Sequence, residues 1–433
     1  MITPIHTSRK FQIFYGWHVL AASFVILFLT TGVAFSIGVM FKPFTDEFGW
    51  NRSSISIAIF INMVMYALSL IVAGKAYDRY GPKWVIVISA VLISAGYMSI
   101  SVVDSIWEFL LFYGILVGSG MGGTSIPLMG ALLTKWFEKW RGLAVSLGIT
   151  GGCVGQFVMV PFLTMSVLKY GWRISFFFIG LVMLVAIGGL GLFVIKGDPE
   201  DLGIEPFGQK CGGNLTGLEE QRFHGSHQQD LTLMQAAKTY SFWLFLSFMF
   251  ICGSGDFLVT THLIPYVNDH GVSSIAAGNM LAWLGLLSLG GILVAGPVSD
   301  MIGNKIPIAL TFVLRFMVFL LILKYENLAS FYIFSLAFGL TLMVTAPLTP
   351  ILAGKLYGFS HVGLISGVVV TVHHLGGGFW SYIGGVIFDR TGSYWLAFVL
   401  SALMSLIAVF CTISIRENRH IADGKAELIK SLT

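Results

Sequence analysis

The chain carries the stretch GKAYDRYGPK at residues 74–83, between its second and third long apolar runs. A second stretch, GPVSDMIGNK at residues 296–305, follows 222 positions later between the eighth and ninth runs. Both contain G-x-x-x-D-x-x-G-x-K, which places these residues at matching positions: Gly74, Asp78, Gly81 and Lys83 in the first copy, and Gly296, Asp300, Gly303 and Lys305 in the second. The recurrence predicts a duplicated six-helix unit, which is typical of carriers that alternate around a central site.

The composition is that of a membrane protein. Of 433 residues, 56% are hydrophobic and 11% are charged, with a mean hydropathy of +0.84. Soluble domains carry about 25% charged residues, so we expect lipid to be the solvent. The basic residues are dispersed through short loops, which disfavours a nucleic-acid partner. The four cysteines have no metal-ligand spacing, so we expect no disulfide framework, metal or cofactor.

Twelve apolar runs are long enough to cross a membrane as helices, which takes about 20 residues each. We predict an all-α membrane protein made of two pseudo-symmetric six-helix bundles. The expected parts are a bundle at 1–195, a linker at 196–238, a bundle at 239–415 and a tail at 416–433. The expected spans are 17–41, 53–76, 84–103, 107–133, 142–168, 172–195, 242–267, 274–298, 306–325, 328–353, 362–388 and 393–415.

Lys and Arg predict the orientation. Eighteen of the 25 lie in the termini, the linker and the loops on that side, and six lie in the opposite loops. Because cytoplasmic loops of membrane proteins are enriched in these residues, we expect both termini in the cytoplasm and the protein in the cell (inner) membrane.

The repeated motif has two interpretations. Gly74 and Gly296 would let helix ends approach a neighbour, and the aspartates would cap the following helices. In the functional interpretation the motif is a latch that holds one state of a carrier. In the other interpretation, its basic residues are ordinary loop charges that reflect only the cytoplasmic side of the membrane.

Arg79 directly follows Asp78, so the first copy resembles the G-x-x-x-D-R-x-G-x-[RK] hallmark of the major facilitator superfamily. The second copy has Met301 in place of the arginine. The resemblance implies the major facilitator fold over nearly the whole chain.

A narrower resemblance rests on FYGW at 14–17, FK at 41–42, GWNRS at 49–53 and GDPEDLG at 197–203. These segments are similar to the monocarboxylate porter branch, which includes relatives of oxalate/formate exchangers. The branch implies proton-coupled symport or exchange of a small organic anion, and it implies that Lys42 meets the substrate carboxylate or couples protons. The alternative for Lys42 is a side chain that reaches the outer surface. Some members carry Asp and Arg in the eighth span, where this chain has Ser288 and Ile292. Either Lys42 and the histidines then supply the positive charge that binds the anion, or the substrate is not a simple monocarboxylate.

Other candidates are ionisable or polar groups within apolar spans. Asp256 is mid-span, where a charge costs about 2.5 kcal/mol or more unless it is paired or wet. We expect Asp256 and His374 in proton coupling, and His262, His373 and Asn279 in substrate binding. For each, a hydrogen bond between helices is the alternative. Arg315 is expected to be structural, because the third helix of each triplet packs outside in this fold.

The sequence therefore predicts a monomeric proton-coupled symporter of a monocarboxylate. Its rivals are an oxalate/formate-type exchanger, an exporter of another organic solute, and a membrane sensor that transports nothing. An enzyme is disfavoured because no concentrated set of catalytic groups is found.

Overall fold

The computed structural model describes residues 14–208, 231–358 and 361–415. Within these ranges, twelve helical spans are long and apolar enough to cross a membrane, which confirms the predicted fold class. The predictions for the tail and for residues 209–230 of the linker lie outside the described residues.

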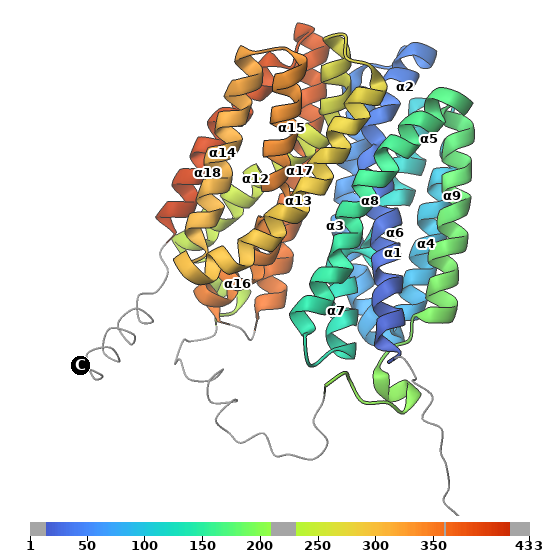
Figure 1. Ribbon diagram of the computed structural model, residues 1–433, viewed down its shortest axis with the longest axis vertical. Coiled ribbons are helices and arrows are strands. Elements are labelled where there is room, and N and C mark those ends of the chain that lie inside the picture. The colour runs from blue at the N-terminus through green and yellow to red at the C-terminus, as the bar shows by residue number, and fades with distance from the viewer. Residues whose placement is uncertain (1–13, 209–230, 359–360, 416–433) are drawn as a thin grey trace, which may run out of the picture.

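The first bundle contains α1 (Gly16–Phe35), α2 (Phe41–Phe48), α3 (Arg52–Tyr80), α4 (Pro82–Ile100), α5 (Ile106–Phe109), α6 (Gly118–Met121), α7 (Ile126–Trp136), α8 (Arg141–Tyr170) and α9 (Trp172–Gly189). The second contains α11 (Leu233–Ala236), α12 (Tyr240–Asp269), α13 (Ser274–Ile302), α14 (Lys305–Lys324), α15 (Leu328–Leu342), α16 (Thr345–Tyr357), α17 (Val362–Thr391) and α18 (Trp395–Ser414). The two bundles stand side by side, and α1 begins at the same end of the molecule at which α18 ends (Figure 1). We call this the termini end and the opposite one the far end.

Turn glycines recur in the backbone at the spacing of the predicted duplication. Gly49 and Gly271 have φ of 66° and 79°, and Gly81 and Gly303 have φ of 78° and 82°. Each pair is 222 residues apart, and glycine suits this left-handed region because it has no Cβ. The expectation that Asp78 caps the next helix is wrong: Gly81 occupies the N-cap of α4, and Asp78 lies within α3. The N-cap of α14 is Asn304, and the side chain of Asp300 lies outside the described atoms.

The bundles meet where α3 packs on α17 and α8 packs on α13. Glycines show how far the contact extends. A Cβ at Gly385 would lie 2.9 Å from the backbone of Arg52, and one at Gly378 would lie 3.0 Å from Phe60 and Met63. Among the described residues, nothing lies within 4 Å of a Cβ at Gly74 or Gly296. The bundles therefore touch from the middle to the far end and separate towards the termini end. In this conformation the expected close approach at the two motif glycines is absent.

Candidate functional site

A cavity of about 260 Å³ lies between the bundles. Its two walls differ in chemistry. The first bundle lines it with apolar side chains and with hydroxyl groups, among them those of Tyr66 and Tyr113. Its charged and imidazole lining groups among the described residues, Asp256, His373 and His374, all come from the second bundle. A polar cluster on one wall of a mostly apolar pocket is the usual form of a small-molecule site.

Asp256 on α12 is the centre of this cluster. Its Oδ1 lies 2.6 Å from Nη2 of Arg315 on α14, and the two side chains are 7% and 1% exposed. Isolated charges at such burial are costly, and an oppositely charged partner offsets the cost. Asp256 lines the cavity whereas Arg315 does not. The carboxylate therefore stands between the guanidinium and the cavity.

Arg315 is held in place by hydrogen bonds to the neighbouring helices. Nε donates to Oγ1 of Thr341 at 3.0 Å, and Nη2 donates to its carbonyl oxygen at 3.0 Å. Nη1 donates to the carbonyl oxygen of Cys252 at 3.1 Å. Asp256 Oδ1 has no hydrogen-bond partner of good geometry, so its contact with Nη2 is an ion pair by distance. The guanidinium is therefore held by hydrogen bonds to α15 and α12 in addition to the ion pair.

The pairing of Arg315 with Asp256 was not predicted from the sequence, which led us to expect a structural role for Arg315 on an outer helix. Its side chain reaches Thr341 on α15 and Cys252 on α12. One signal was available. An arginine in the middle of an apolar helix requires an acid nearby, and Asp256 is also mid-span.

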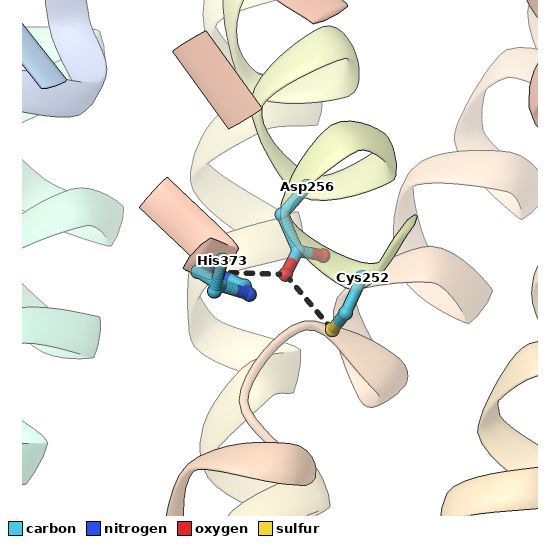
Figure 2. Close-up of side chains that lie close together, drawn as sticks. All are labelled: Cys252, Asp256 and His373. Carbon is cyan, nitrogen blue, oxygen red and sulfur yellow. Dashed lines mark hydrogen bonds and ion pairs between the residues drawn. The ribbon is translucent and has the colours of Figure 1, made fainter. Parts of the chain in front are cut away.

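His373 and Cys252 complete the cluster, and both point towards Asp256 (Figure 2). His373 Nε2 lies 3.7 Å and Cys252 Sγ 3.5 Å from Asp256 Oδ2. These three ligand atoms lie within 4.8 Å of one another, a spacing that could hold a metal ion. However, the guanidinium of Arg315 already neutralises the carboxylate and would repel a divalent cation. The cluster is better described as an ion pair with an adjacent imidazole and thiol.

His374 lies beside this cluster with a defined tautomer. Its Nδ1 is 2.8 Å from the carbonyl oxygen of Val370. A carbonyl oxygen only accepts, so Nδ1 carries the proton and Nε2 keeps a lone pair. The ring packs edge-on against Tyr66 at 4.7 Å between centroids. Lining the cavity, His374 can accept a proton or a hydrogen bond there.

His262 lies away from the cavity, where a substrate-binding residue was expected. It is fully buried and does not line the cavity. Its Nε2 donates to the carbonyl oxygen of Ser381 at 2.8 Å, so Nδ1 must accept from the hydroxyl of Tyr394 at 2.9 Å. Both nitrogens are used, and in this conformation none is left for a cargo. The interpretation that fits is the alternative one, a hydrogen bond between helices.

Two further candidates also lie away from the cavity. The first span is longer than expected, and Lys42 falls in α2, where Phe41 and Phe44 are buried and Lys42 is exposed. Because successive positions on a helix point in different directions, burial of the two phenylalanines turns the lysine outward. Asn279 is half-buried on α13 and is not among the lining residues. In this conformation neither side chain can contact a ligand in the cavity.

The motif residues gather at the termini end. Asp78 and Arg79 are exposed and Lys83 is half-buried. In the second copy, Lys305 Nζ donates to the carbonyl oxygens of Ile415 at 2.6 Å and Ile413 at 3.3 Å. This lysine stabilises the end of α18.

The sequence profile of the Major Facilitator Superfamily matches residues 23–323 and 244–431. The chain belongs to the Major Facilitator Superfamily. An uncharacterized MFS-type transporter, YcxA of Bacillus subtilis (strain 168), is 25% identical over 93% of this chain and 98% of its own. Monocarboxylate transporter 13 of Bos taurus is 24% identical, over 90% of this chain and 87% of its own. The structure of a D-xylose-proton symporter shares this superfamily fold, with a TM-score of 0.70, 14% identity, and coverage of 93% of this chain and 98% of that one.

Proposed function

We propose that this protein is a secondary active transporter that moves a small organic anion, most simply a monocarboxylate, together with a proton by alternating access. The observation that carries the proposal is the buried ion pair of Asp256 and Arg315 at the cavity wall. Relatives named monocarboxylate transporters support the cargo class.

The ion pair offers a physical reason for coupling. With Asp256 ionised, the charge of Arg315 is compensated and a second carboxylate in the cavity is repelled. When Asp256 takes up a proton, the guanidinium becomes an uncompensated buried cation. Such a loss costs about 3–5 kcal/mol, and an anion in the cavity offsets it. At about 1.4 kcal/mol per tenfold, joint binding of proton and anion is favoured by roughly a hundred- to a few-thousand-fold.

His374 and His373 extend this scheme. The bare Nε2 of His374 can hold a proton at the cavity surface, and His373 lies within 3.7 Å of the carboxylate that receives it. The eighth span, α13, has Ile292 where some relatives of the monocarboxylate porter branch carry an arginine. Arg315 on α14 supplies this positive charge instead. Because Arg315 can take the place of the missing arginine, a simple monocarboxylate remains the proposed cargo, although neither Lys42 nor His262 faces the cavity in this conformation.

We also propose how the protein is oriented in the membrane and which state of the transport cycle this conformation represents. With both termini in the cytoplasm of a cell (inner) membrane, the separation of the bundles at the termini end makes this conformation inward-facing. The repeated motif then lies on the open side. Its role as a latch belongs to the opposite state, in which Gly74 and Gly296 would come close to the other bundle. One copy of the chain contains the whole cavity, so a monomer suffices.

Uptake of labelled lactate into proteoliposomes tests the proposal. We expect uptake to rise when the outside is more acidic, and Asp256→Asn to lose this response while still binding lactate in a thermal-shift assay. Uptake that needs an anion inside and ignores the pH gradient would indicate exchange instead. Absence of transport across a panel of carboxylates, with a partner protein binding the linker, would favour the sensor.

A further inference from the structure

The far end is closed by Arg52, the first residue of α3. Its Nη2 lies 2.6 Å from Oδ1 of Asp269, and its Nη1 lies 2.7 Å from Oδ2 of the same residue. Two parallel N–H···O bonds of this kind are the strongest and most specific way for an arginine to bind a carboxylate. The side chains of Arg52 and Asp269 are 15% and 35% exposed, so the pair is partly shielded from water.

A second carboxylate binds beside the first. Asp389 Oδ1 accepts the backbone N–H of Arg52 at 3.0 Å, and its Oδ2 accepts that of Ser53 at 2.8 Å. The guanidinium also donates to the hydroxyl of Tyr394 at 2.9 Å and stacks over Phe388 at 3.7 Å. We call Arg52, Asp269 and Asp389 the far-end clamp.

The clamp joins the two bundles. Arg52 belongs to the first, and both aspartates belong to the second, on α12 and α17. Alternating access requires the bundles to separate at this end, so both carboxylates leave when it opens. What stays on the first bundle is a guanidinium that has just lost a bidentate carboxylate, next to two freed N–H groups. These groups have the geometry for a carboxylate because they hold carboxylates in the closed state.

We propose that Arg52 is an outer docking site for the carboxylate of the cargo, and that Asp269 and Asp389 occupy it while the far end is closed. The inference rests on the proposed function, since it takes the cargo to be an organic anion. A carboxylate from outside competes with Asp269 for the guanidinium and so favours the open state. The cargo then meets two arginines in turn, Arg52 at the mouth and Arg315 at the centre.

The chain provides a matched control at the same end. Arg173 also contacts two carboxylates, Glu47 at 2.5 Å and Asp104 at 2.7 Å. All three of these residues belong to the first bundle, so separating the bundles breaks neither contact. Arg173→Gln removes the same charge and similar pairs without touching the contact between bundles.

Distances across the far end test the inference. Spin labels on cysteines replacing Lys42 in α2 and Lys324 at the end of α14 report the opening by double electron–electron resonance. In the labelled parent and in Arg173→Gln, we expect lactate, but not chloride, to increase the population with a long distance. In Asp269→Asn/Asp389→Asn this population should be high already. Its lactate dependence should shift to concentrations about tenfold or more lower, because less of the protein is held closed.

Arg52→Gln decides between a gate and a docking site. As a gate residue alone, its loss would open the far end and leave the response to lactate intact. As a docking residue, its loss opens the far end and abolishes the further response to lactate. A response in Arg52→Gln equal to that of the parent overturns the docking site, while the proposed transport stands if lactate still stabilises the protein and Arg315→Met abolishes that stabilisation. If lactate does not bind the parent protein, the transport proposal and the docking site both fall.

Discussion

The pairing of Asp256 with Arg315 makes a quantitative prediction about stability. Asp256→Asn keeps the size of the side chain but leaves the guanidinium, 1% exposed, without a counter-charge. Removal of one partner of a buried pair costs about 3–5 kcal/mol in the free energy of unfolding. Arg315→Met removes the other charge and the four hydrogen bonds to Thr341 and Cys252. It leaves a carboxylate that can recover part of the cost by binding a proton.

The double variant Asp256→Asn/Arg315→Met is the informative one. With both charges gone, no buried ion remains uncompensated, and replacements of whole buried pairs by neutral side chains are often neutral or stabilising by 1–4 kcal/mol. We therefore expect the double variant to be more stable than Asp256→Asn and to bind no anion. Neighbouring residues typically have coupling energies of about 0.5–3 kcal/mol. We expect the coupling energy between Asp256→Asn and Arg315→Met to be about 3 kcal/mol or more.

Denaturant titration of the purified protein in detergent, followed by tryptophan fluorescence, measures the four free energies of the cycle. Ser288→Ala on α13 provides a control substitution outside the pair. If the double variant loses the sum of the two single losses, the residues do not act as a pair. The electrostatic basis of the proposed coupling would then be wrong.

Three further predictions concern packing, the motif and the exposed lysine. A Cβ at Gly155 would lie 2.1 Å from the carbonyl oxygen of Phe28, so Gly155→Ala should lower the free energy of unfolding by about 1–3 kcal/mol. Gly188 has no described atom within 4 Å of the same position, so Gly188→Ala should be neutral or stabilising in the same titration. A Cβ at Gly74 has no described neighbour within 4 Å in this conformation, so the Gly74→Leu variant should fold normally. In the opposite state a clash of about 1–3 kcal/mol would slow uptake by roughly 5–150-fold. Unchanged uptake would show that the motif is not a latch. Lys42→Ala should keep the thermal shift given by the best carboxylate ligand, because Lys42 is exposed outside the cavity, and loss of that shift would return it to the binding site.

Much of the architecture follows from the sequence alone. Length and apolarity decide whether a helix can cross a bilayer, so the twelve spans were predictable, and the duplicated motif predicted two related bundles. Glycine at the repeated turns reflects a local backbone requirement that is visible in the sequence. Asp256, His373 and His374, which line the cavity, could be chosen as candidates because ionisable groups within apolar helices are costly without a partner or a role.

Partners across helices depended on the tertiary structure. Helical periodicity shows which residues of one helix share a face, but not how that helix is rotated against its neighbours. Rotation of α14 decides that Arg315 meets Asp256, and rotation of α12 turns His262 to Tyr394 and away from the cavity. The far-end clamp joins Arg52 to Asp269, which are 217 positions apart in the sequence. Whether the clamp forms depends on how the two bundles are tilted relative to each other. That tilt is a property of the packed bundles, which no single segment encodes.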